Sequence, residues 1–223
     1  MKIYYPMSRL FPLLLLLLVA CGRTQSTDAL LAEVWAKDQN SRQQMMELTK
    51  AITVEGRAEL IDSLLLASEA VDRIDNENIT IIDSLLQDGL PKHLAPESYK
   101  TIWIVIDHAS LEKQEQYLPL IEQMADDDLI GRDEYATLFD RIEMKNNRPQ
   151  RFGSQTVQFG TPDAMSFYVW PIEEPDKVDS LRATVGLTPL SEYIKQLTEA
   201  TGIEAKYDPA ISVEQLNKMR YDE

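Results

Sequence analysis

His108 is the residue of this sequence whose surroundings best suit proton transfer. It follows the continuous apolar run 102–106, so its imidazole is expected at the edge of the core. The other histidine, His93, lies in a short polar loop after Pro91. An imidazole titrates near neutral pH and can act as a general acid or base. We therefore take His108 as the first candidate catalytic residue. The structural alternative, a ring that holds a helix end by a hydrogen bond, stays open.

Asp38 and Arg42 are candidates to act beside this histidine. They are four residues apart in a segment with helical periodicity, so their side chains lie on one helical face and can form an ion pair. An exposed pair of this kind contributes at most about 0.5 kcal/mol. Gln39 lies one residue further round the helix. Asp38 is the second candidate catalytic residue, and Gln39 and Arg42 are candidate ligand-binding residues.

A second group of polar side chains surrounds the pair Gly153-Ser154. Its members are candidate ligand-binding residues: Asp140, Arg141, Gln150, Gln155 and Arg182, with Arg151 beside them. The planar guanidinium of arginine can form two parallel hydrogen bonds to a carboxylate or a phosphate, and glutamine both donates and accepts. The group therefore predicts a pocket for a small polar or anionic ligand. In the alternative interpretation, Asp140 and Glu173 or Glu174 pair with these arginines and hold a hairpin against the helices.

The N-terminus has the features of a bacterial lipoprotein signal. Lys2 and Arg9 precede the apolar run 10–20, which is too short to span about 30 Å of hydrocarbon but matches the core of a secretory signal. Residues 18–21, Leu-Val-Ala-Cys, resemble a lipobox that ends in Cys21, the only cysteine. We expect cleavage before Cys21, a diacylglycerol on its thiol and a further acyl chain, such as palmitate, on its amino group.

This signal predicts a protein of the bacterial cell envelope that is lipid-anchored, on the outer membrane, with its domain on the periplasmic or the surface face. Removing residues 1–20 takes away two basic residues and changes the formal net charge from −15 to −17. So acidic a chain has no excess of lysine and arginine for the phosphates of nucleic acid or for anionic lipid headgroups. The lipid on Cys21 therefore has to supply the membrane attachment, and we expect no nucleic acid partner.

We expect no metal and no cofactor. With Cys21 acylated, the domain has no thiol for catalysis, for a disulfide or for metal binding, and two histidines cannot form a three-histidine site. The acidic stretch that starts at Asp126 fails as a calcium loop because Ile130 and Thr137 occupy ligand positions. The phosphate-binding, dinucleotide, nucleophile-elbow and zinc-protease motifs are absent from the sequence.

Hydrophobic periodicity predicts one mainly helical domain over 28–223 after a tether at 21–27. The predicted helices cover 29–48, 55–72, 76–87, 111–124, 133–145 and 190–200. The run 102–109 is rich in β-branched residues and fits a buried strand as well as a helix. One small β-hairpin is expected at about 151–170, near the C-terminal third, with a turn at Gly160, Pro162 and Asp163.

Several of these segments together resemble an uncharacterised bacterial family, domain of unknown function 6624 (DUF6624). The matching segments are 38–42, 107–109 with Gln116, 140–141, 149–155, 171–175, 181–182 and 186–187. The resemblance implies a mainly helical fold and favours a helix over 102–109, but it implies no activity. Family members more often have tyrosine and threonine in place of Phe152 and Ser154, and often aspartate in place of Ser110. If that aspartate served an activity, Ser110 would argue against the activity here.

We therefore expect a lipid-anchored envelope protein of unknown biochemical activity that binds a small polar or anionic ligand or an envelope protein partner. The alternative is an envelope enzyme that uses His108 as general acid or base on a small anionic substrate. Whether the protein is an enzyme is left open by the sequence.

Overall fold

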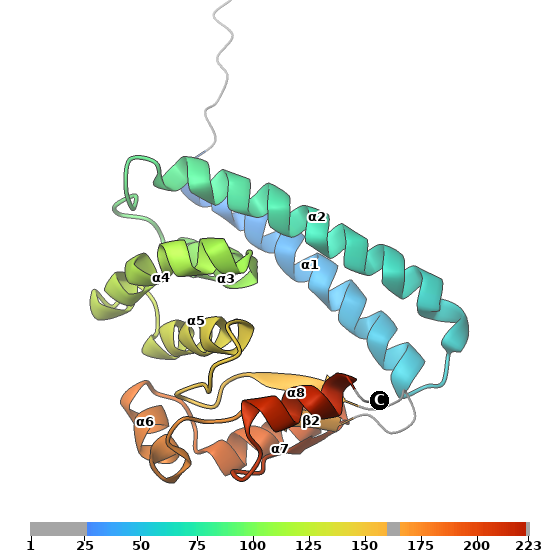
Figure 1. The fold of residues 1–223 in the computed structure, drawn as a ribbon. Helices are drawn as coiled ribbons and strands as arrows, with labels where there is room; N and C mark the ends of the chain where they lie inside the picture. Colours follow the sequence, from blue (N-terminus) through green and yellow to red (C-terminus); the bar gives the residue numbers. More distant parts are fainter. Residues whose placement is uncertain (1–25, 160–165, 222–223) are drawn as a thin grey trace, which may run out of the picture.

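The computed structural model describes residues 26–159 and 166–221, and this part of the chain is mainly helical, as predicted (Figure 1). The helices are α1 (Thr27–Thr53), α2 (Ile61–Leu86), α3 (Pro96–His108), α4 (Leu111–Asp126), α5 (Arg132–Lys145), α6 (Val178–Thr184), α7 (Leu190–Thr201) and α8 (Val213–Tyr221). The strands are β1 (Thr156–Phe159), β2 (Ser166–Val169) and β3 (Glu204–Lys206). The predicted signal peptide, Cys21 and the predicted turn at Gly160, Pro162 and Asp163 lie outside the described residues.

The long helices α1 and α2 form an antiparallel hairpin, and α3 packs against both (Figure 1). Helix α1 begins after Ser26, whose hydroxyl accepts a hydrogen bond from the Ala29 N–H at 3.1 Å. Leu31 and Val34 of α1 and Ile82 of α2 are buried against α3 in the largest apolar cluster. This packing brings side chains from three helices that are far apart in sequence to one place.

Helix α2 corrects the prediction of separate helices at 55–72 and 76–87. It runs without a break for 26 residues. The polar stretch around Asp75, between the two predicted helices, contains neither glycine nor proline. Its buried positions, Ala67, Val71, Asn78 and Ile82, continue at helical spacing across the stretch. The polar side chains therefore lie along one helix and do not mark its end.

The ambiguous run 102–109 forms the second half of α3 and its C-cap, Ala109, as the family resemblance favoured. Helix α3 begins with Pro96. Proline is common at the first helical position because an N–H there would have no intrahelical partner, so its absence costs no hydrogen bond. Ile102, Trp103, Val105 and Ile106 are all buried. A helix that is apolar on nearly all sides is a buried helix, which explains why its sequence also fitted a buried strand.

The predicted hairpin is confirmed, and a third strand extends it to a sheet of order β1-β2-β3. Strands β1 and β2 are antiparallel, with Thr156 opposite Val169 and Phe159 opposite Ser166. The unpredicted β3 is parallel to β2, and the chain crosses between them through α6 and α7. A parallel pair needs such a crossover connection. In the described ranges, no helix has the length and apolarity that a membrane span requires.

Candidate functional site

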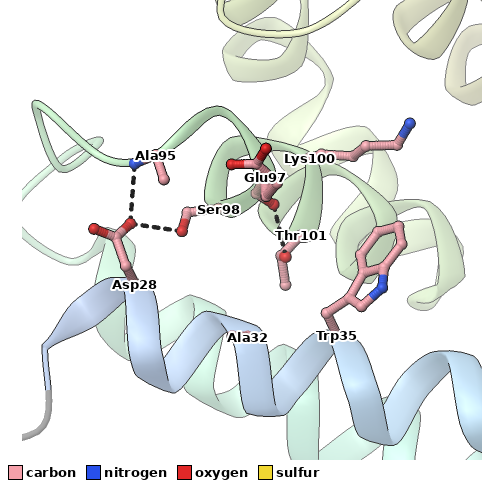
Figure 2. Close-up of a pocket in the computed structure, with 8 residues that line it drawn as sticks. All are labelled: Asp28, Ala32, Trp35, Ala95, Glu97, Ser98, Lys100 and Thr101. Carbon is pink, nitrogen blue, oxygen red and sulfur yellow. Dashed lines mark hydrogen bonds between the residues drawn. The ribbon is translucent and has the colours of Figure 1, made fainter.

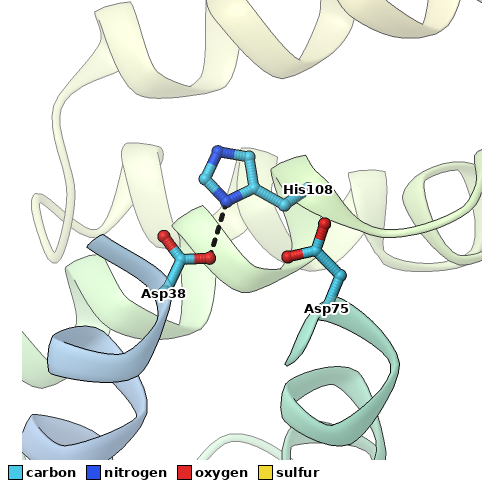
Figure 3. A group of neighbouring side chains, drawn as sticks. All are labelled: Asp38, Asp75 and His108. Carbon is cyan, nitrogen blue, oxygen red and sulfur yellow. Dashed lines mark hydrogen bonds and ion pairs between the residues drawn. The ribbon is translucent and has the colours of Figure 1, made fainter. Parts of the chain in front are cut away.

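Asp38 and His108, the two candidate catalytic residues, are in direct contact (Figure 3). Asp38 lies on α1 with its side chain 1% exposed, and His108 is the last residue of α3. The Asp38 Oδ1 atom is 2.9 Å from Nδ1 of His108. Gln39 donates its amide N–H to the other carboxylate oxygen at 2.8 Å. Helix packing thus brings together residues 70 positions apart in the sequence.

Arg42 completes this cluster and confirms the predicted pair with Asp38. Its Nε atom is 3.4 Å from Asp38 Oδ1 and 2.9 Å from His108 Nδ1, and a terminal nitrogen is 2.6 Å from Asp75 Oδ1. Nδ1 of the neutral ring cannot accept from Arg42 and donate to Asp38 at once. A buried carboxylate only accepts, so we assign the Nδ1 proton to the bond with Asp38. The Nε–H of Arg42 then faces the same carboxylate.

This tautomer leaves Nε2 of His108 as the reactive nitrogen. Within residues 26–159 and 166–221, Nε2 has no hydrogen-bond partner, and Figure 3 shows the ring turned so that this nitrogen points away from both carboxylates. The His108 side chain is 16% exposed. An imidazole that is oriented by a carboxylate on one nitrogen and open on the other has the geometry of a general base.

Burial and charge act differently on the two aspartates. Burial raises the pKa of Asp38, but the hydrogen bond and charge of His108, with the charge of Arg42, outweigh it and leave that pKa below its ordinary value. Burial raises the pKa of Asp75 above its ordinary value, although Arg42 acts to lower it. Asp38 is therefore held ionised, whereas Asp75 accepts a proton more readily.

Asp75 is the member of the cluster that the sequence did not reveal. It falls between the predicted helices at 55–72 and 76–87, where no helical face gives its side chain a direction. On the continuous helix α2, Asp75 lies one turn from Val71 and Asn78, which are buried, so it faces the same interior. An unbroken helical interpretation of 61–86 would have indicated its position.

The same three side chains could hold a divalent cation. One ligand atom from each of Asp38, Asp75 and His108 lies within 4.8 Å of the others. Carboxylate oxygens and an imidazole nitrogen suit several divalent metals. However, the Arg42 guanidinium approaches all three within 3.4 Å and supplies the positive charge itself. A metal ion would have to displace Arg42.

Helix α5 contributes two cations near this cluster. Arg141 pairs with the buried Asp107 at 2.9 Å, and the Lys145 ammonium donates to the Ala109 carbonyl at 3.1 Å. Burial and the charge of Arg141 lower the pKa of Lys145, whereas Asp107 and Asp75 act to raise it. Both cations therefore lie beside the C-terminal end of α3, which also carries His108.

Ser110 caps the helix that follows His108. Ala109 and Ser110 alone join α3 to α4, and the Ser110 hydroxyl accepts from the Lys113 N–H at 3.4 Å as the N-cap of α4. Aspartate and serine are about equally good N-caps. The Ser110 side chain therefore has a helix-capping role at this position.

Asp140 organises the loop after α5 and binds backbone groups, not the arginines of the alternative interpretation. Its fully buried carboxylate accepts from the N–H groups of Arg151, Phe152 and Ser154 at 2.8–3.0 Å and from the Ser154 hydroxyl at 2.9 Å. Burial raises the pKa of Asp140, and these donors act to lower it. The loop is thus wrapped around one carboxylate.

The remaining candidates support the same loop. Gln150 donates to the carbonyls of Gln155 and Trp170 and accepts from the Gln155 N–H, while the Gln155 side chain donates to the Thr137 carbonyl. Arg182 is 1% exposed and donates to the carbonyls of Phe152 and Gly153 at 2.7 and 3.1 Å. The side chains of Gln150, Gln155 and Arg182 are thus used to hold the backbone of the loop in place.

Arg151 has a different placement from the other arginines. It is exposed, and its guanidinium lies 5.5 Å from the centre of the Phe152 ring. Its side chain therefore takes no part in either buried network, although its backbone N–H donates to Asp140.

Comparison with known proteins identifies one family. A model described as a family of unknown function, DUF6624, matches residues 25–206. This range contains both the His108 cluster and the loop around Asp140. No curated protein and no solved structure matches the chain significantly.

Asp140→Asn should lower the free energy of unfolding by about 3 kcal/mol. The amide would bring its own N–H₂ towards backbone donors and leave buried groups unsatisfied. Urea denaturation of the two proteins measures the difference. The matched change Asp88→Asn, at an exposed position, should stay within about 0.5 kcal/mol of the parent. Equal effects of the two substitutions would contradict the role given to Asp140.

Proposed function

This chain belongs to the DUF6624 family. We propose that it binds a small anionic ligand at the C-terminal end of α3, beside the cations of α5, in a protein held at the bacterial cell envelope by a lipid on Cys21. The observation that carries the binding proposal is the Lys145 ammonium, which donates to the Ala109 carbonyl directly after His108 and has Arg141 one turn before it on α5. A charged donor bonds an anion more strongly than a neutral one does.

The charges of this region favour an anion at Lys145. Arg42 is engaged by Asp38 and Asp75, and Arg141 by Asp107. Among the described residues, Lys145 has no carboxylate partner at ion-pair distance and donates only to a carbonyl. Its ammonium therefore has donor capacity for a carboxylate or phosphate group, with the partly exposed Arg141 beside it. The other class of ligand expected from the sequence is an envelope protein partner.

The proposed location rests on the N-terminal sequence. The basic start, the short apolar run and Leu18-Val19-Ala20-Cys21 together match a lipoprotein signal. Stable attachment takes about two acyl chains, as a processed Cys21 would carry. The acidic domain is not attracted to an anionic bilayer, so the lipid alone has to attach the protein to the membrane.

Acid–base catalysis is the second candidate function, and the Asp38–His108 pair favours it specifically. Asp38 would keep the proton on Nδ1, and Nε2 would take a proton from a water molecule or a substrate hydroxyl. Arg141 and Lys145 would hold the anionic group of the substrate. Pure binding does not require a buried carboxylate behind the histidine, so this pair is the feature that favours chemistry.

Lys145→Gln should weaken the binding of an anion by about tenfold, because it removes one charge-assisted hydrogen bond. Inorganic phosphate and acetate are the probes, titrated calorimetrically into the full chain. Lys92→Gln, at an exposed lysine in the α2–α3 connection, is the matched control and should leave affinity unchanged. Failure of both probes to bind, or equal losses in the two variants, would contradict the binding site.

If the site is catalytic, His108→Gln should lower turnover by about 100-fold or more, the usual contribution of a general acid or base. A panel of 4-nitrophenyl esters and phosphates measures this, and Asp38→Asn should fall between parent and His108→Gln. Phosphate affinity should change far less than turnover. An inactive parent chain would reject the catalytic candidate and leave the binding proposal to the titration above.

Replacement of Cys21 by serine should abolish lipid attachment. Metabolic labelling with an alkyne-bearing fatty acid should mark the parent chain, whereas Cys21→Ser should be unlabelled. The parent should sediment with membranes, because two acyl chains hold it there. Two unlabelled, freely soluble products would refute the envelope anchor without bearing on the His108 site.

A further inference from the structure

A pocket of about 450 Å³ lies between the first turns of α1 and the start of α3 (Figure 2). It is separate from the His108 cluster: Trp35 precedes Asp38 by one helical turn on α1, and Thr101 precedes His108 by two turns on α3. Its lining includes Asp28, Ala32, Trp35, Glu97, Lys100 and Thr101. Its volume is within the range of small-molecule sites, about 300–1,000 Å³.

The charged groups of this pocket are mainly negative. Asp28 accepts hydrogen bonds from the Ala95 N–H at 3.0 Å and the Ser98 hydroxyl at 2.6 Å, which fix its carboxylate and lower its pKa. Within the described ranges, the carboxylate of Glu97 has no ion pair or hydrogen bond. The one lining cation, Lys100, is 3.1 Å from Glu134, outside the pocket.

The apolar wall is built around an indole. Trp35 stands up from α1 towards α3, with Ala32 one turn before it and Thr101 opposite (Figure 2). Tryptophan is only half-buried here, so its ring is accessible from the pocket. The face of an indole is the strongest of the aromatic side chains in attracting a cation.

We propose that this pocket binds an organic cation, an ammonium group carried on a small apolar body. The ammonium lies on the indole face of Trp35, in a pocket that Asp28 and Glu97 make negative, and the apolar body fits against Ala32 and Thr101. A carboxylate or phosphate would meet two negative charges with no free cation to offset them. The ligand class is thus opposite in charge to that of the His108 site, and the two proposals stand independently.

The test is a titration of the full chain with three probes of similar size: benzyltrimethylammonium, benzyl alcohol and benzoate. The cation should bind at least about tenfold more tightly than the other two, as expected for ammonium on an indole face. In nitrogen-labelled protein, one of the three tryptophan indole signals should shift on titration, and that signal should be the one missing from Trp35→Phe.

Two variants and one control decide the assignment. Trp35→Leu should weaken binding of benzyltrimethylammonium by about tenfold and Glu97→Gln by about three- to fivefold. Glu69→Gln, at an exposed position on α2, should leave it unchanged. Glu97 is exposed, so its variant keeps the test valid if Trp35→Leu fails to fold. Equal affinity for the three probes, no shift of the Trp35 signal, or equal losses in Glu97→Gln and Glu69→Gln would overturn the proposal.

Discussion

The contact between the Asp38 carboxylate and the His108 ring is the interaction on which the arrangement of the helical half depends. A carboxylate that is almost fully buried is costly unless charged or hydrogen-bonding groups surround it. The groups around the Asp38 carboxylate are His108 at the end of α3 and Gln39 and Arg42 on α1. Arg42 then requires Asp75 of α2. One buried charge thus fixes the relative positions of three helices, while the apolar cluster around Ile106 supplies the general driving force for burial.

The C-terminal third uses a second buried aspartate in a different way. Asp140 gathers backbone N–H groups of the loop that follows α5, and Gln150 and Arg182 satisfy the carbonyls of the same region. Gly153 has φ of +68°, and a Cβ atom there would come within 2.9 Å of Ile172, so the loop needs glycine at this point. The two aspartates therefore do different things. Asp38 leaves a histidine nitrogen open, whereas Asp140 leaves no acceptor free for a ligand.

Periodicity identified α1, α4, α5 and α7, because each has a clear apolar stripe, and the residues of the later site were recognised as chemically capable. Their association was not predictable in the same way. Asp75 falls between the predicted helices 55–72 and 76–87, so the prediction gave its side chain no helical face, whereas in the structure the two ranges belong to one helix. The roles of Gln150 and Arg182 were missed because their partners are backbone carbonyls, which every residue carries and no pattern marks. Strand β3 and helices α6 and α8 are too short for periodicity to show.

The connection between α3 and α4 consists of Ala109 and Ser110 alone, and the serine hydroxyl holds the first turn of α4. So short a connection couples the orientation of α4 to that of α3. Tilting α4 about this joint would swing the imidazole at the end of α3 relative to the carboxylate behind it. A protein bound to the outer side of α4 would therefore change the position of the His108 ring without contacting any of the charged groups around it.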